Sequence, residues 1–297
     1  MTRIPPDESD PRAPRREMRR IRAEGGEGIG AGDWLAAFRR ACDRISVAAA
    51  SMSPAERGAP TGDGAGGDVT VMIDRVAEDI VIAEIEALGM PLTLLSEEAG
   101  TLAVAGGGPT FVVVDPIDGS FNASRGLPVF STSIAVAEGP TIGDVVLGLV
   151  RDHGTGEEWT AERGRGARLN GLPITAEGAG SGDRLELLLV EGAFPARLEA
   201  AARMLDGRVG RIRALGSLAL SLCHTAAGRG DAMVGLGPGR TVDVAAAQLV
   251  AREAGLLVGL PDVAALAPTP LDLEARFHVT AARDAATLDL LGRVAAR

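Results

Sequence analysis

Apolar residues recur at helical spacing in the first third of the chain. Asp33 is expected to be an N-cap, and the helix after it carries Trp34, Leu35, Phe38, Ala41 and Ile45 on one face. After a glycine-rich loop at residues 58–67, a second helical pattern comprises Ile73, Val76, Ala77, Ile80 and Ile85. Asp74 is therefore predicted to lie where that loop becomes a helix.

Shorter apolar runs with the composition of strands come next. Leu92–Leu95 and the β-branched run Phe111–Val114 are both followed by acidic residues. Residues 129–150 alternate in the manner of antiparallel strands, and Asn170-Gly171 supplies hairpin-turn chemistry. The pattern predicts a strand-rich first half.

The second half alternates strands with helices. Strands are predicted at 187–190, 256–259 and 277–281, and helices at 196–205, 218–227, 242–252 and 284–294. The whole pattern predicts an α/β (α+β) fold of layered helices and sheets. We expect an N-terminal α+β lobe at 31–180, which carries the acidic motifs, and a C-terminal α/β lobe at 181–297. Residues 1–30 mix Pro, Gly, Arg and acids without apolar periodicity and are expected to form a disordered arm.

Composition and charge narrow the classes of function. The net charge of -10 argues against a nucleic-acid partner, because a phosphate backbone requires a positive protein surface. Cys42 and Cys223 are far apart, which fits a reducing cytoplasm and excludes a cysteine zinc site. Because no stretch approaches the roughly 18 apolar residues of a membrane helix, we expect a cytoplasmic protein without a membrane partner.

Acidic residues stand at the ends of several predicted elements. Asp74 and Asp243 lie at helix starts, Glu97 follows one strand, and Asp115 and Asp118 follow another. Functional sites commonly assemble at such ends. Carboxylates at these positions suit a hard cation such as Mg²⁺, which prefers oxygen ligands.

The hexapeptide Asp115–Ser120, of sequence Asp-Pro-Ile-Asp-Gly-Ser, contains two of these acids. Pro116 restricts the backbone, and Gly119 permits another group to approach it closely. By itself the hexapeptide is equally compatible with a plain turn, because Asp-Pro and Asp-Gly steps are ordinary turn chemistry. The backbone N–H groups of Gly119 and Ser120 are expected to point at a phosphate from a helix start.

The order of these motifs resembles that of the inositol monophosphatase family. The resemblance is carried by Glu97-Glu98, Asp115–Asn122, Gly164–Ala167 with Asn170-Gly171, Arg213–Ser217, Asp243–Ala246 and Glu253–Gly255. The run Phe121–Pro128 is most similar to the archaeal-type dual inositol monophosphatase and fructose-1,6-bisphosphatase branch. The resemblance implies a layered αβαβα sandwich of the sugar-phosphatase type and a homodimer.

The resemblance also implies a Mg²⁺-dependent phosphomonoesterase that acts on a small sugar or polyol phosphate, inositol 1-phosphate or fructose 1,6-bisphosphate. Two or three Mg²⁺ ions are implied in each active site. Glu97, Asp115 and the Ile117 carbonyl would hold one ion. Asp115, Asp118 and Asp243 would hold a second.

Catalytic and substrate-binding roles follow from the same resemblance. Asp74 and Ser120 would orient the attacking water, and either Glu97 or a third, loosely held metal ion would assist its deprotonation. The residues expected to bind substrate are Gly119, Ser120, Arg213 and Ser217.

Two alternatives stay open at this point. An adenosine 3',5'-bisphosphate nucleotidase would share the motifs, although no evident aromatic shelf for adenine lies near them in the sequence. A catalytically silent regulator that binds a sugar phosphate would share the fold. Gly235 stands where animal members carry a Glu that contacts inositol hydroxyls, so the alcohol that is released stays open as well.

Overall fold

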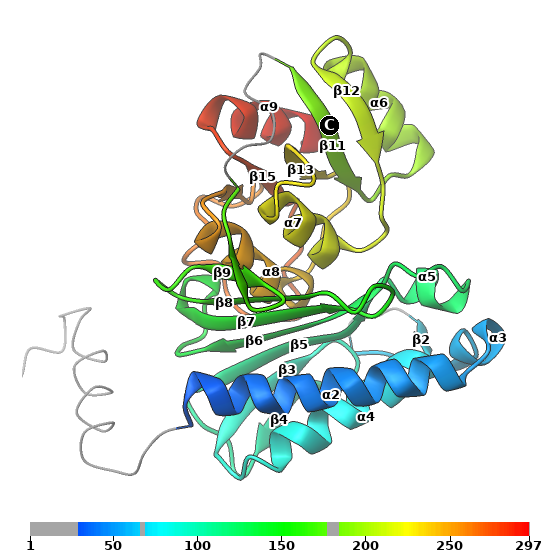
Figure 1. Cartoon of the computed structure of the whole chain (residues 1–297), viewed down its shortest axis with the longest axis vertical. Coiled ribbons are helices and arrows are strands. Elements are labelled where there is room, and N and C mark those ends of the chain that lie inside the picture. Colours follow the sequence, from blue (N-terminus) through cyan, green and yellow to red (C-terminus); the bar gives the residue numbers. More distant parts are fainter. Residues whose placement is uncertain (1–28, 66–68, 177–183, 297) are drawn as a thin grey trace, which may run out of the picture.

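Two helices near the start of the chain pack together and cover one face of a sheet (Figure 1). In the computed structural model, which describes residues 29–65, 69–176 and 184–296, these helices are α2 (Ala31–Ser51) and α4 (Met72–Glu86). The predicted apolar stripes are buried against the sheet. However, the N-cap of α2 is Gly30, and Asp33 accepts a hydrogen bond from the Gly30 N–H at 3.3 Å. The prediction that Asp33 is the N-cap is therefore wrong, because its carboxylate caps the helix from one turn further along.

The sheet under these helices has eight strands. Their spatial order is β10 (Leu172–Ile174), β9 (Ala167–Leu169), β8 (Glu158–Glu162), β7 (Val145–Asp152), β6 (Ser131–Ala137), β5 (Phe111–Asp118), β3 (Leu92–Ser96) and β4 (Gly100–Val104). Neighbouring strands are antiparallel except β3 and β5, which are parallel. The two strands predicted to precede acidic residues are confirmed as β3 and β5. A 3₁₀ turn, η1 (Ile142–Asp144), precedes β7.

The glycine-rich segment before α4 forms a hairpin near the end of this sheet. It contains α3 (Pro54–Arg57), β1 (Pro60–Asp63) and β2 (Val69–Val71). The backbone N–H of Ala65 donates to the Glu98 carbonyl at 3.0 Å, so the hairpin is attached to the β3–β4 turn. The predicted loop is thus partly ordered as paired strands.

A second sheet is built from the C-terminal half. Its spatial order is β12 (Val209–Arg213), β11 (Leu185–Glu191), β13 (Ala232–Gly235), β15 (Thr280–Ala282) and β14 (Leu257–Gly259). Helices α7 (Leu218–Ala226) and α8 (Thr241–Glu253) lie between the two sheets, and α6 (Pro195–Leu205) and α9 (Ala285–Ala295) cover the outer face (Figure 1). The predicted layered αβαβα sandwich is confirmed.

Helix α8 connects the two halves of the molecule. It packs against β5, β6, β7 and β8 of the first sheet and against β14 of the second. Its apolar residues belong to the central core that both sheets share. The start of α8, which contains Asp243, is thereby held near the end of β5.

The boundary predicted between residues 180 and 181 falls within 177–183, which lies outside the described residues. Residues 1–28 of the predicted arm lie outside the described residues as well. The division into lobes stays a prediction. Within the described ranges, no helix is both long enough and apolar enough to cross a bilayer.

Candidate active site

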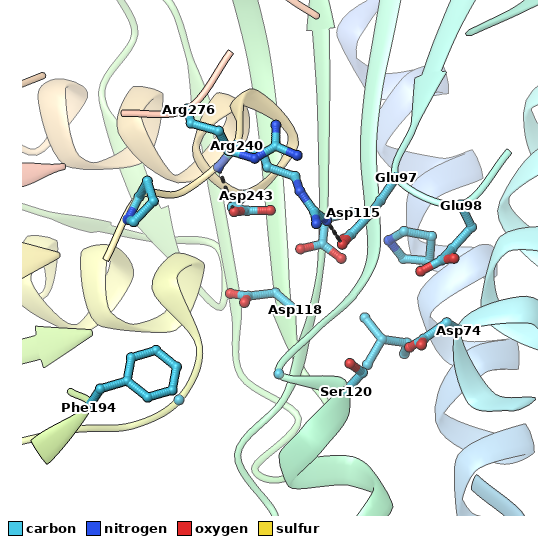
Figure 2. A pocket seen from close by; sticks show the side chains of 15 residues that line it. Asp74, Glu97, Glu98, Asp115, Asp118, Ser120, Phe194, Arg240, Asp243 and Arg276 are labelled. Atoms are coloured by element: carbon cyan, nitrogen blue, oxygen red, sulfur yellow. Dashed lines mark hydrogen bonds and ion pairs between the residues drawn. The ribbon is translucent and has the colours of Figure 1, made fainter. Parts of the chain in front are cut away.

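The acidic motifs converge on one cleft of about 710 Å³. Its lining consists of Asp74, Glu97, Glu98, Asp115–Ser120, Phe194, Gly216, Pro238, Arg240, Asp243 and Arg276. Figure 2 shows the carboxylates of both halves of the chain gathered around a shared space. All five acids predicted to bind metal or activate water lie in this lining, although they come from α4, the β3–β4 turn, β5 and α8.

Helix starts place two of these acids. Asp74 is the third residue of α4, and its Oδ2 accepts a hydrogen bond from the Val71 N–H at 3.2 Å. Asp243 is the third residue of α8, and its Oδ2 accepts one from the Arg240 N–H at 2.8 Å. A carboxylate at this position satisfies a free N–H of the first turn, so the local capping pattern fixes the side chain. Oδ1 of Asp74 is buried and has no hydrogen-bond partner, so it is available to a ligand.

A bulge in β5 places the next two acids. Asp115 pairs with Ser133 of β6 and Asp118 with Ser131, so Pro116 and Ile117 together stand opposite one residue of β6. Pro116 has no N–H to give to the ladder, which makes a bulge the natural position for it. Asp115 is only 2% exposed, and its Oδ1 lacks a hydrogen-bond partner.

Asp118 is held by the start of α7. Its Oδ2 accepts hydrogen bonds from Ser217 Oγ at 2.6 Å and from the Ala219 N–H at 2.7 Å. Ser217, predicted to bind substrate, is buried and directed at this carboxylate. Arg213, also predicted to bind substrate, lies on β12 and donates to the Ile212 carbonyl at 2.8 Å. The structure therefore places neither Arg213 nor Ser217 in the cleft lining.

Gly119 and Ser120 do lie in the lining, at the start of the short helix α5 (Ser120–Ser124). The backbone of Gly119 has a φ of 93°, and a Cβ there would lie 3.0 Å from the carbonyl oxygens of Val129 and Gly216. Only glycine fits both this conformation and this close approach. Ser120 and Asp74 lie on the same side of the carboxylate cluster (Figure 2).

Burial is the main reason why the acids of the cleft hold their protons more strongly than usual. It raises the pKa of Asp74 to about 7, and of Asp118 to about 7 with a further contribution from the charge of Asp243. Burial and the charge of Asp243 together raise the pKa of Glu97 to about 8. Burial and the neighbouring Glu97 raise the pKa of Asp115 well above its ordinary value. The cluster is thus short of positive charge.

A metal ion would supply that charge. One oxygen each of Glu97, Asp115 and Asp243 lie within 4.8 Å of one another, an arrangement that could hold a metal ion. Hard cations bind such oxygen sets, and the partnerless Asp115 Oδ1 fits a ligand atom. The Arg240 guanidinium forms an ion pair with Glu97 (Figure 2), so a cation at Glu97 would have to compete with it.

The cleft lining also contains residues that were not predicted as site residues, among them Phe194, Arg276 and Glu98. Phe194 is 66% exposed at the rim and is the N-cap of α6. Arg276 lines the cleft, and its guanidinium donates to the carbonyls of its own loop, including Leu273 at 2.7 Å. Glu98, also in the lining, accepts a hydrogen bond from Thr70 Oγ1 and ties the β1–β2 hairpin to the site. Phe194 lies far from the acidic motifs in the sequence, so the sequence alone did not indicate that its ring lines the cleft.

Comparison with known proteins shows where this chain belongs. The profile of the inositol monophosphatase family matches residues 37–293. A fructose-1,6-bisphosphatase/inositol-1-monophosphatase of Methanothermobacter thermautotrophicus is 39% identical over 206 residues, which are 66% of this chain and 72% of the relative. A solved inositol monophosphatase–fructose 1,6-bisphosphatase superposes with a TM-score of 0.76 at 25% identity, over 88% of this chain and 99% of that structure.

A relative with a longer chain is also similar. A bifunctional NADP phosphatase/NAD kinase of Methanococcus maripaludis is 30% identical over 212 residues, 66% of this chain. The match spans only 37% of that protein.

Proposed function

The chain belongs to the inositol monophosphatase family of phosphoric monoester hydrolases, and we propose that it is a Mg²⁺-dependent enzyme that hydrolyses a small sugar or polyol phosphate. Inositol 1-phosphate and fructose 1,6-bisphosphate are the substrates to test first, because the names of the archaeal relatives carry both activities. The observation that supports this best is the set of oxygens from Glu97, Asp115 and Asp243 within 4.8 Å of one another.

The metal would be held by the acids of the cleft. Glu97, Asp115 and the Ile117 carbonyl would bind one Mg²⁺, and Asp118 and Asp243 would join Asp115 at a second, with a third ion as an option. Bound Mg²⁺ supplies positive charge that lowers the pKa of a water and offsets the charge of the phosphate oxygens.

The protein groups orient the reactants. Asp74 and Ser120 would hold the attacking water through the free Oδ1 of Asp74 and the serine hydroxyl. Glu97 would accept its proton, and the N–H groups of Gly119 and Ser120 would donate to the phosphate oxygens. The water oxygen would form a bond to phosphorus while the bond to the ester oxygen breaks, and the departing alkoxide would take a proton from solvent and leave as the alcohol.

The remaining expectations are parts of the same proposal. We expect a cytoplasmic homodimer whose partner is a small phosphorylated metabolite, with no nucleic acid and no membrane. The net charge of -10 supports the exclusion of nucleic acid.

A second candidate is favoured by the rim of the cleft. The exposed ring of Phe194 in the cleft lining offers a flat apolar surface on which the base of a nucleotide could stack. A nucleotide ester such as adenosine 3',5'-bisphosphate is therefore the second substrate class to test.

Phosphate release from inositol 1-phosphate, fructose 1,6-bisphosphate and adenosine 3',5'-bisphosphate, with Mg²⁺ and with EDTA, tests the proposal. We expect release that requires Mg²⁺ and is nearly abolished in Asp243→Asn, because this change removes a negative ligand but little volume. The ratio of kcat/KM values identifies the class of alcohol. Absence of release from every ester by the folded, Mg²⁺-loaded wild-type protein would instead favour a silent regulator.

A further inference from the structure

The bulge in β5 leaves a backbone carbonyl outside the sheet ladder. Pro116 and Ile117 both stand opposite Thr132, so β6 cannot pair with each of them by its main chain. The side chain of Thr132 supplies the missing partner, since its Oγ1 donates to the Pro116 carbonyl at 2.7 Å. Thr132 is completely buried, so a carbonyl left without this donor would be costly.

The direction of the next hydrogen bonds follows from the number of protons. Thr132 has one hydroxyl proton, and it is used on Pro116. His153 Nε2, 2.8 Å from Thr132 Oγ1, must therefore be the donor of their bond. In a neutral ring Nδ1 is then the acceptor, and Ser46 Oγ, 2.8 Å away, donates to it.

The His153 imidazole, at the centre of this series of hydrogen bonds, is also held by other contacts. Its ring stacks on Phe130 with 5.4 Å between centroids and 24° between planes. The His153 backbone N–H donates to the Phe130 carbonyl at 3.0 Å. Burial lowers the pKa of His153 to about 3, so the ring is neutral in the folded protein at neutral pH. Ser46 lies on α2, so the series of hydrogen bonds runs from an N-terminal helix to the floor of the cleft.

We propose that Ser46, His153 and Thr132 form a positioning relay that holds the Pro116–Ile117 bulge in the shape required to present the β5 carboxylates to a metal ion. The bulge lies directly between Asp115 and Asp118, both of which line the cleft. A rotation of the Pro116–Ile117 peptide would move both carboxylates and the Ile117 carbonyl. Groups that orient metal ligands commonly change metal affinity when they are removed. The inference rests on the proposed function only in that these acids bind a divalent cation.

Mn²⁺ binding measured by calorimetry without substrate tests the relay. Carboxylate sites that suit Mg²⁺ also take Mn²⁺. Thr132→Val keeps the shape of the side chain but removes the hydroxyl, and we expect roughly tenfold weaker Mn²⁺ binding. Thr132→Ser retains the hydroxyl and should restore affinity. Ser46→Ala, two hydrogen bonds further away, should weaken binding by a smaller factor and serves if Thr132→Val does not fold.

Thr225→Val is the matched control. Thr225 is also completely buried, and its Oγ1 donates to a backbone carbonyl, that of Ser221, at 2.8 Å. Loss of this hydrogen bond in Thr225→Val should lower the melting temperature, as Thr132→Val does, but should leave the Mn²⁺ dissociation constant unchanged. The activity of Thr132→Val should also require more Mg²⁺ for half-maximal rate.

Each result separates the two proposals. Failure of the wild-type protein to bind Mn²⁺ would overturn the metal site itself. Wild-type binding together with unchanged affinity in Thr132→Val would overturn the relay alone, as would an equal loss of affinity in Thr225→Val. When Thr132→Val does not fold, unchanged affinity in Ser46→Ala overturns the relay.

Discussion

At the scale of single residues, Phe194 departs from the usual rule for helix N-caps. It occupies the N-cap of α6, where Ser, Thr, Asp or Asn would satisfy a free N–H, and most of its ring is exposed. The Arg197 guanidinium lies 5.6 Å from the ring centroid, which helps to fix the ring. Residues that break a local rule without structural gain often serve function.

Phe194→Ala should therefore change substrate choice without a general loss of activity. Stacking of a base on an aromatic ring contributes about 1–3 kcal/mol, so kcat/KM for adenosine 3',5'-bisphosphate should fall by at least about fivefold. The value for inositol 1-phosphate should stay within about twofold of wild type. Steady-state kinetics on both esters make the measurement.

Phe121→Ala provides the control, because Phe121 is 69% exposed, carries Arg125 at 5.2 Å from its ring and lies outside the lining of the acidic cleft. Equal losses on both esters in Phe194→Ala, or the same selective loss in Phe121→Ala, would contradict the assignment of Phe194 to the leaving group.

At the scale of elements, the junction between β5 and α5 sets the geometry of the site. The strand ends at Asp118, the helix begins at Ser120, and Gly119 makes the turn between them with a positive φ. A residue with a side chain would be strained there and would also press on two carbonyl oxygens.

Gly119→Ala should destabilise the fold and lower kcat together. The left-handed conformation costs about 1–3 kcal/mol for a residue other than glycine, and the two contacts at 3.0 Å add to this. Urea unfolding and phosphate release measure the two effects. Gly207→Ala is the control, since Gly207 has a φ of 74° but nothing within 4 Å of a new Cβ. A similar stability loss in both variants, with kcat unchanged in Gly119→Ala, would rule out crowding at the junction.

The apolar pattern predicted most helices and strands because each of these elements buries one face in the core. The stripes of α2 and α4 and the runs of β3 and β5 were visible for this reason. Strand β12 was missed because Arg211 and Arg213 interrupt it at the exposed edge of the second sheet. The acids of the site were predicted from their places at element ends and from the resemblance of their order to the inositol monophosphatase family, whereas the position of Phe194 in the cleft depends on the tertiary fold, which no local pattern encodes.

At the scale of the whole molecule, the cleft concentrates negative charge that folding must bury. The acids at 74, 97, 115, 118 and 243 all have raised pKa values, with burial as the first cause. The folded protein thus keeps protons that the unfolded chain has already released. By linkage, this contribution to stability falls as pH rises from the ordinary carboxyl range through the folded pKa values of about 7 to 8.

Without metal, the melting temperature should therefore be lower at pH 8.5 than at pH 7. His153 has the opposite effect: because its pKa is lowered in the folded protein, the fold loses stability as pH falls below the pKa that His153 has in the unfolded chain. A comparison made above pH 7 keeps this effect small. Saturating Mg²⁺ should raise the melting temperature more at pH 8.5, because it favours the ionised acids. Scanning calorimetry in EDTA and in Mg²⁺ makes the comparison. A melting temperature in EDTA that is constant or rises over this range would show that the cluster is not short of positive charge.

The floor and the rim of the cleft come from different parts of the sequence. Apart from Asp243, the acids of the floor come from residues 74–118, while Phe194, Pro238 and Arg276 of the rim come from loops of the second sheet. Under the proposed function, reactivity and recognition would thus be encoded by different stretches of the sequence. Changes in the rim loops would then exchange one alcohol for another while the acids that act on the phosphate ester stay intact, and such a scaffold would readily evolve new substrate preferences.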